Sequence, residues 1–202
     1  MNNVISNSKL NKNTQDRTIS KRTFCWNERP CYRYQSCDYC WRRRVSYLMK
    51  QIDRVCKDWN LKQFITLNVE LTDLHYKDQL LVLIKLRPLV QRELRKHSKY
   101  INVVAIKITD DLATAHYHIL ASDLNQHVFK EKMKKHIPFN TNIHFKRLYN
   151  DSIGNLKMCL YYLLINWRES LIYKPKNKQL LSASKGFYTG RPKNIAIKGW
   201  KL

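Results

Sequence analysis

The chain has 202 residues and carries 38 Lys and Arg against 15 Asp and Glu, a formal net charge of +23. That length predicts one domain with an appendage or two small domains, enough to bury a proper core. A globular chain this basic repels itself unless it meets a polyanion, so nucleic acid is the expected partner. We find no apolar run of bilayer length, no secretory signal and no clean basic amphipathic helix, which argues against a membrane partner and favours a cytoplasmic protein with reduced cysteines.

Residues 1–20 are rich in Asn, Ser and Lys and show no periodicity, so they predict a disordered leader. Residues 21–58 follow as a Cys-rich basic segment that ends in a helix. The segment holds four cysteines: Cys25, Cys31, Cys37 and Cys40. Four thiolates so close together can bind one structural zinc ion in a tetrahedron, although the spacing is not that of a double C-x-x-C ribbon. The alternative is a set of free thiols in a loop rich in Tyr and Trp.

A helix is predicted over residues 42–59, because apolar residues recur there at spacings of three and four. It begins with the basic triplet Arg42, Arg43 and Arg44. The main domain is predicted over residues 59–173.

Strands and helices alternate through this domain. Strands are predicted over residues 63–70, 101–109, 114–120 and 141–149. Helices are predicted over residues 79–96, 124–136 and 153–168, the first with a candidate interruption at Pro88. The order predicts an α+β fold: a central antiparallel sheet of four to five strands, with the second and third strands as a hairpin and helices on one face.

The tail, residues 174–202, interleaves Lys and Arg with aromatic and turn residues, among them Lys185, Phe187 and Arg191. Cations that meet phosphates and rings that stack on bases suit a single strand of nucleic acid. The alternative is a loop-rich tail that wraps over the core.

The strand over 114–120 carries His116 and His118, which point to one face because side chains alternate along a strand. Two adjacent imidazoles can bind one divalent metal ion. The alternative is an ordinary polar strand face.

The helix over 153–168 carries two adjacent tyrosines, Tyr161 and Tyr162. Neighbouring residues on a helix lie about 100° apart, so only one of the two hydroxyls can face the histidines. We favour Tyr162 as the nucleophile, with Tyr161 as the alternative. Both tyrosines could instead be packing residues.

Three motifs therefore follow one another: Phe-Ile-Thr-Leu-Asn at 64–68, His116-Tyr117-His118, and Tyr161-Tyr162, about fifty and about forty-five residues apart. Together they resemble the HUH endonuclease superfamily, the rolling-circle replication initiators of plasmids and single-stranded DNA phages. Those proteins have a first motif like "FLTLT", a His-hydrophobic-His second motif and a tyrosine on a helix.

Two further segments extend the resemblance, which covers about residues 25–190. Ser-Ala-Ser-Lys-Gly at 182–186 is similar to a Ser-(Arg/Lys)-Gly segment of filamentous-phage initiators, and the Cys37-x-x-Cys40 motif with the arginines after it is similar to the start of small-phage initiators. The resemblance implies metal-dependent nicking and joining of single-stranded DNA, with Mn or Mg as cofactor and a tyrosine 5′-phosphodiester as intermediate. It implies the cytoplasm of a bacterial or archaeal host, replication of a phage, plasmid or satellite, and a host helicase as a further partner.

We expect the DNA to be contacted by the basic triplet, the first motif and the tail. The residues are Arg42, Arg43, Arg44, Thr66, Asn68, Lys185, Phe187 and Arg191.

Two departures from the family leave alternatives open. The usual acidic or polar third metal ligand is replaced by Lys107, so Asp110, Asp111 or Glu70 would have to supply an oxygen. The lysine that typically follows the tyrosine by three residues is missing. The alternatives are an HUH nicking nuclease aimed at a competing element and a degenerate DNA-binding protein that interferes with replication.

Overall fold

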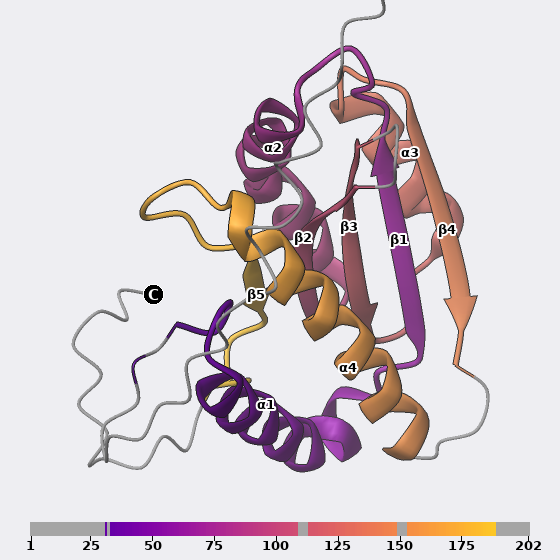
Figure 1. Ribbon diagram of the computed structural model, residues 1–202. Helices are drawn as coiled ribbons and strands as arrows, with labels where there is room; N and C mark the ends of the chain where they lie inside the picture. The colour runs from indigo at the N-terminus through magenta and orange to yellow at the C-terminus, as the bar shows by residue number, and fades with distance from the viewer. Residues whose placement is uncertain (1–30, 32, 109–112, 149–152, 189–202) are drawn as a thin grey trace, which may run out of the picture.

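The computed structural model describes residues 31, 33–108, 113–148 and 153–188. Within them, the chain folds into a five-stranded antiparallel sheet packed with four α-helices, which confirms the predicted α+β class (Figure 1). The helices are α1 (Asp38–Trp59), α2 (Tyr76–His97), α3 (Gln126–His136) and α4 (Ile153–Ser170), with a short 3₁₀ turn η2 (Leu171–Tyr173). The strands are β1 (Gln63–Val69), β2 (Tyr100–Ile108), β3 (Ala113–Ala121), β4 (Thr141–Arg147) and β5 (Leu181–Ala183).

The strand order is β4-β1-β3-β2-β5, so the histidine strand β3 lies at the centre. The predicted hairpin of β2 and β3 is present, with Val103 opposite His118. The fifth strand comes from the segment that we predicted as a tail: β5 pairs with β2 at one edge of the sheet. Part of that tail therefore belongs to the folded core. α2 runs through Pro88 without a break.

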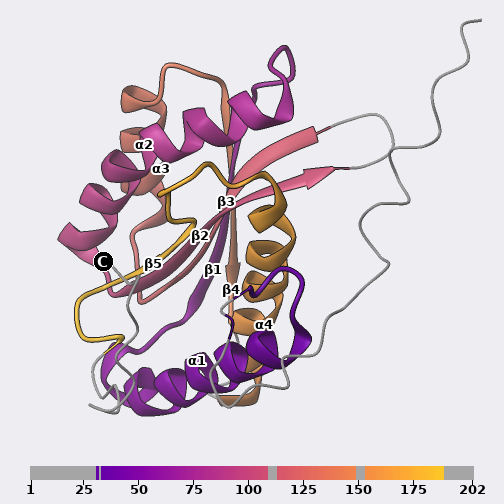
Figure 2. The same ribbon diagram turned by 60° about the vertical axis from the view of Figure 1, so that its left-hand side comes forward.

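Helices cover both faces of the sheet, so our expectation of a single covered face is wrong (Figure 2). On one face, the Tyr117 hydroxyl donates to the Leu83 carbonyl of α2. On the same face, Phe129 of α3 packs against Phe145 of β4. On the other face, α4 packs over β2 and β3. The physical reason is the connection: α2 joins β1 to β2 on one side, whereas α4 follows the edge strand β4 and crosses back over the other side.

Two polar anchors fix the position of α4, one to β2 and one to α1. The Ile106 amide donates to the Ser170 hydroxyl over 2.9 Å, and this hydroxyl donates in turn to the Asn166 carbonyl. Arg168 forms a 2.5 Å ion pair with Asp38 at the start of α1. Both ends of this network are buried or half-buried, so the helix is held against the sheet and against α1.

The turn after β5 packs against α1. Gly186 has a φ of 97°, a left-handed conformation that glycine adopts without strain. Arg54 of α1 donates to the carbonyl of Phe187 over 3.0 Å, and the Phe187 ring lies 5.8 Å from the ring of Trp59.

No helix among the described residues combines the length and the apolarity needed to cross a membrane.

Candidate active site

Polar side chains from three neighbouring strands meet on the face of the sheet that α4 crosses. The β1–β3 register places Thr66 opposite His118 and Asn68 opposite His116, as the first and second motifs predict. The β1–β4 register continues both rows to the edge of the sheet. We call this set the polar face: Thr66, Asn68, His116, His118, Asn142 and His144.

The two histidines form the centre of the polar face. Their Nε2 atoms lie 3.0 Å apart, and both side chains are almost fully buried. Nδ1 of His116 lies 3.2 Å from the Thr114 carbonyl oxygen, which can only accept, so this nitrogen carries the proton. Nδ1 of His118 lies 3.3 Å from the Thr66 hydroxyl. Nε2 of His116 is then an acceptor, and both Nε2 atoms are free to bind one metal ion only when Nδ1 of His118 also carries its proton and donates to the Thr66 hydroxyl.

Burial keeps both rings neutral. It lowers the pKa of His116, with a further contribution from the positive charge of Lys107. It also lowers the pKa of His118, to about 3, together with the neighbouring His116. Neutral imidazole is the form that binds metal ions. Two nitrogens that each bind one ion at about 2.1 Å and at right angles lie about 3 Å apart, so the pair fits adjacent positions on a metal ion.

The described residues place no third His, Cys, Asp or Glu ligand beside this pair. Lys107 of β2 lies opposite Thr114 of β3, and its ammonium cannot ligate a metal ion. Glu70 accepts a 2.6 Å hydrogen bond from Asn140 and is exposed beyond the end of β1. Asp110 and Asp111 lie outside the described residues.

The sequence reasoning missed Asn166 of α4, whose side chain lies close enough to His118 to raise the pKa of that ring against the effect of burial. Its Nδ2 donates to the Tyr162 carbonyl over 2.8 Å, which leaves the amide oxygen for another partner. Amide oxygens are common ligands of hard divalent cations. The signal for Asn166 was its spacing, because residues four apart on a helix lie on the same side.

Tyr162 is the candidate nucleophile that the structure places at the histidines. Its ring centroid lies 5.2 Å from that of His118 and 5.9 Å from that of Phe64. The residue is 52% exposed, so it stands at a surface that a substrate can approach. Tyr161 is 47% exposed and, among the described residues, makes no ring contact with either histidine. The neighbouring Leu160, Leu163 and Leu164 are buried, and their packing holds α4 against the sheet.

The expected DNA contacts divide into three groups. Arg42, Arg43 and Lys185 are exposed, and Thr66 and Asn68 lie half-buried on the polar face. Phe187 is fully buried, so the prediction that it contacts DNA is wrong: its ring packs on Trp59 and cannot stack on a base.

Arg44 is also buried, at 9% exposed, although we expected it to contact DNA with the rest of the basic triplet. Its guanidinium packs among aromatic rings, which holds it at the wall of a cleft described below. Arg191 lies outside the described residues.

Three of the four candidate zinc ligands lie together at the start of α1. The ligand atoms of Cys31, Cys37 and Cys40 all lie within 4.8 Å of one another, and the Sγ atoms of Cys31 and Cys40 are 3.5 Å apart. Sulfur ligands about 2.3 Å from a tetrahedral zinc ion lie about 3.8 Å apart, so this cluster could bind a metal ion such as zinc. Cys25 lies outside the described residues.

No protein family, no curated protein and no solved structure matches this chain.

Proposed function

We propose that this chain is an HUH-type endonuclease that cuts and rejoins single-stranded DNA through a covalent bond to Tyr162. One observation carries the proposal: an exposed tyrosine ring lies 5.2 Å from His118, and the Nε2 of His118 lies 3.0 Å from that of His116. A nucleophile and a pair of metal-binding nitrogens therefore face the same space between α4 and the sheet.

His116 and His118 would hold a divalent ion, Mn or Mg, with the amide oxygen of Asn166 as a third ligand from the protein. Such an ion, when bound, polarises a phosphate oxygen as a Lewis acid. The polar residues around the pair have their own tasks. Thr66 fixes the His118 ring through its 3.3 Å contact with Nδ1, and the Thr114 carbonyl fixes the His116 ring.

The reaction needs the tyrosine, the DNA and water as the carrier of one proton. The Tyr162 oxygen attacks the phosphorus, a tyrosine–phosphate bond forms and the bond from phosphorus to the 3′-oxygen breaks. The tyrosine proton is transferred through solvent to the departing 3′-oxygen. The ester keeps the energy of the original bond, so the 3′-hydroxyl can later attack it and restore the strand.

The resemblance to rolling-circle initiators favours a role in starting replication of a phage, plasmid or satellite, with a host helicase to open the duplex. A nicking nuclease that attacks a competing element would use the same chemistry. Plasmid maintenance in cells separates these two roles: only the initiator is needed for copying of its own element.

A second candidate function is a DNA-binding protein that has lost catalysis and interferes with replication. The observation that favours it is Lys107, which stands where the family has its third ligand, while the described residues bring no carboxylate to the histidines. The decisive difference between the candidates is a covalent protein–DNA adduct.

The test uses a labelled single-stranded oligonucleotide library with Mn²⁺ and a denaturing gel. We expect the protein to form an adduct that resists denaturation and that Tyr162→Phe abolishes. Tyr161→Phe is the matched control, because it removes the same hydroxyl from the adjacent position and should leave the adduct in place. An adduct mapped by mass spectrometry to any other residue would refute the assignment, and no adduct with Mn²⁺ or Mg²⁺ would favour the DNA-binding candidate.

We also propose that the cysteine cluster holds one structural zinc ion, with Cys25 as the fourth ligand. Elemental analysis of the native protein should find one zinc per chain, and Cys37→Ser with Cys40→Ser should remove it. A zinc-free protein whose four thiols all titrate would exclude this ion.

A further inference from the structure

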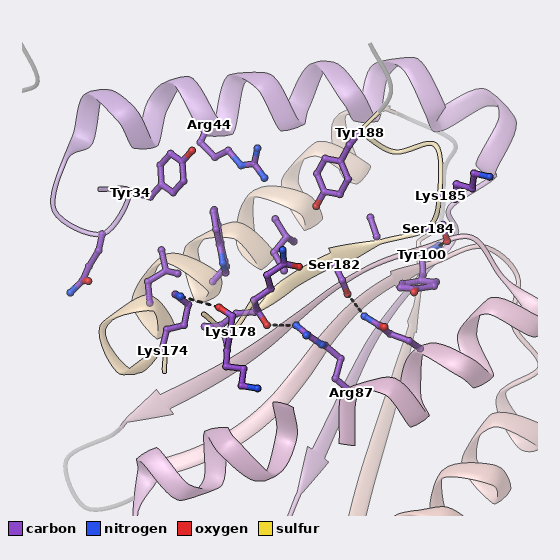
Figure 3. Close-up of a pocket in the computed structure, with 18 of the residues that line it drawn as sticks. Tyr34, Arg44, Arg87, Tyr100, Lys174, Lys178, Ser182, Ser184, Lys185 and Tyr188 are labelled. Carbon is purple, nitrogen blue, oxygen red and sulfur yellow. Dashed lines mark hydrogen bonds between the residues drawn. The ribbon is translucent and has the colours of Figure 1, made fainter. Parts of the chain in front are cut away.

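A second feature of the molecule is a large cleft beside the edge strand β5. Its volume is about 900 Å³, and its walls come from the start of α1, the end of α4, the outer side of α2 and the segment around β5 (Figure 3). We call it the cationic cleft. Seven basic side chains line it, and no acidic side chain does so among the described residues. None of the residues of the polar face belongs to its walls.

The positive charge of the cleft is partly built into the core. The Arg44 guanidinium lies 6.0 Å from the ring centroid of Tyr34, 5.9 Å from that of Trp167 and 5.8 Å from that of Tyr188. The aromatic cage and the burial of Arg44 fix this charge in a wall of low polarity, where its field is screened less than at an open surface. Figure 3 shows Tyr34, Arg44 and Tyr188 together on the α1 side of the cleft.

A second group of cations holds the opposite wall in place. Arg87 of α2 donates to the Gln179 carbonyl, and the Lys174 ammonium donates to the Lys178 carbonyl over 2.9 Å. These bonds tie the segment that leads into β5 to α2 and to itself. The side chains of Lys178 and Lys185 are exposed at the rim, where their ammonium groups can meet a ligand.

The chemistry of such a cleft selects its ligand. Lys178 and Lys185 at a rim that no acidic side chain of the described residues lines can bind an anion, and Tyr and Trp rings offer flat apolar surfaces beside it. A nucleotide combines both properties, since its phosphate pairs with Lys and Arg while its base stacks on a ring. The volume lies within the range of about 300–1,000 Å³ that is typical of ligand pockets.

We infer that the cationic cleft binds nucleotide units of a single DNA strand, with phosphate at Lys178 and Lys185 and a base beside Tyr34 or Tyr188. This site would be separate from the place of cutting. α4 connects the two: Tyr162 faces the histidines, and Trp167 and Leu171 of the same helix and its continuation line the cleft. At about 1.5 Å and 100° per residue, Trp167 is about 7.5 Å farther along the helix axis than Tyr162 and is turned about 140° away from it. A strand that contacts both sites would therefore have to pass around α4. The inference rests on the proposed function only for the choice of DNA as the source of the nucleotide.

The test compares two double charge reversals in the full-length protein. Lys178→Glu with Lys185→Glu changes the cleft, and Lys132→Glu with Lys134→Glu makes the same charge change on the exposed side of α3. Binding of a fluorescent fifteen-residue oligo(dT) is measured by anisotropy, without divalent metal, at several salt concentrations. We expect the cleft variant to lose at least about tenfold in affinity and to lower the salt slope by about 1.4, the share of two phosphate contacts on a single strand. The α3 variant should lose less than about threefold.

Equal losses in both variants would overturn the inference, because they would show only the field of the whole protein. The binding assay contains no divalent metal and measures no cutting, so its result is independent of the nicking chemistry. A second arm titrates ATP and dAMP and follows tryptophan fluorescence. Tight binding of a free nucleotide that the cleft variant loses, while its oligo(dT) binding stays intact, would overturn the strand as the ligand. Competition of free nucleotide with oligo(dT) only at millimolar concentration would support the strand.

Discussion

The two faces of the sheet are built from neighbouring residues of the same strands, yet they have different surroundings. On β1 and β3, Ile65, Leu67 and Tyr117 point toward α2 and are fully buried. Thr66 and His118, their direct neighbours in the chain, point toward α4 and belong to the polar face. On the α2 side, apolar side chains pack closely and exclude water. On the α4 side, hydroxyl, amide and imidazole groups lie beneath a helix with an exposed tyrosine.

This difference shows how one short stretch of sequence serves two purposes. A strand turns alternate residues to opposite sides, so the residues that stabilise the sheet and the residues that carry the proposed chemistry are separated by one position. The burial of each apolar side chain stabilises the fold by about 1.5–3 kcal/mol. Substitutions on the polar face should therefore lower nicking activity more than the free energy of unfolding. Substitutions on the apolar face should lower the free energy of unfolding more than nicking activity.

The largest effect is expected from His116→Ala with His118→Ala. Loss of both nitrogens removes the metal site. Mutation of a residue that only supports a metal ligand lowers metal affinity or activity by about 10–100-fold. Loss of the ligands themselves should therefore lower metal-dependent nicking by more than about 100-fold. Cleavage of a labelled oligonucleotide measures this, and circular dichroism during thermal unfolding serves as the control. The variant should still unfold cooperatively and above the temperature of the nicking assay, so that lost nicking cannot be attributed to an unfolded protein. Nicking at the wild-type rate would contradict the metal assignment.

The reverse case is Leu67→Ala on the apolar face. Truncation of a fully buried leucine leaves a cavity and should lower the free energy of unfolding by about 2–5 kcal/mol. The matched control is Thr66→Ala, which changes the adjacent, half-buried residue and should cost about 1 kcal/mol or less. Urea unfolding measures both. Similar losses from the two variants would show that the faces do not differ in their contribution to stability.

Much of this arrangement could be predicted from the sequence, because it depends on alternation and spacing. The β-branched and aromatic residues of 63–70 and 101–109 indicated strands, and the two-residue spacing of His116 and His118 placed both on one face. The strand registers confirm that Thr66 and Asn68 lie beside them. Local pattern is sufficient here, since each strand needs only a neighbour with a matching face.

The parts that could not be predicted depend on contacts between distant residues. β5 has three residues, too few for a periodic signal, and it pairs with β2 about eighty positions earlier in the chain. Phe187 follows a Ser-Lys-Gly sequence that indicates an exposed loop, yet Arg54 binds its carbonyl and the ring packs on Trp59. The face on which α4 packs depends on how the chain leaves the edge strand, which no single segment encodes.

A smaller effect on the polar face is expected from Asn166→Ala. This residue raises the pKa of the nearby His118, and its Nδ2 donates to the Tyr162 carbonyl, so its loss should weaken metal binding by about tenfold. Titration of Mn²⁺ against nicking rate gives the metal affinity. Asn166→Asp supplies a carboxylate oxygen at the same place and should restore or tighten metal binding. If neither variant changes the titration, Asn166 is no ligand.

The smallest effect concerns a charged residue on the α2 side of the sheet, Glu93, whose side chain is almost fully buried. The Lys96 ammonium, 3.0 Å away, and then Arg92 hold the pKa of this carboxyl below its usual range. A carboxyl whose folded pKa is depressed adds stability above its unfolded pKa of about 4.3, and this stability is lost as the pH falls toward the folded pKa. Because Lys96 and Arg92 are about half exposed, water screens their ion pairs with Glu93, and we expect Glu93→Gln to cost about 1 kcal/mol or less at pH 7.

Urea unfolding of the wild type and of Glu93→Gln at pH 7 and pH 3 measures this. The difference in free energy of unfolding between the two proteins should be present at pH 7 and shrink at pH 3. Glu131→Gln at pH 7 is the control for the removal of one exposed carboxylate, here one that lies 3.3 Å from His127. A difference that persists undiminished at pH 3 would mean that the glutamate stabilises α2 by packing and not by its charge.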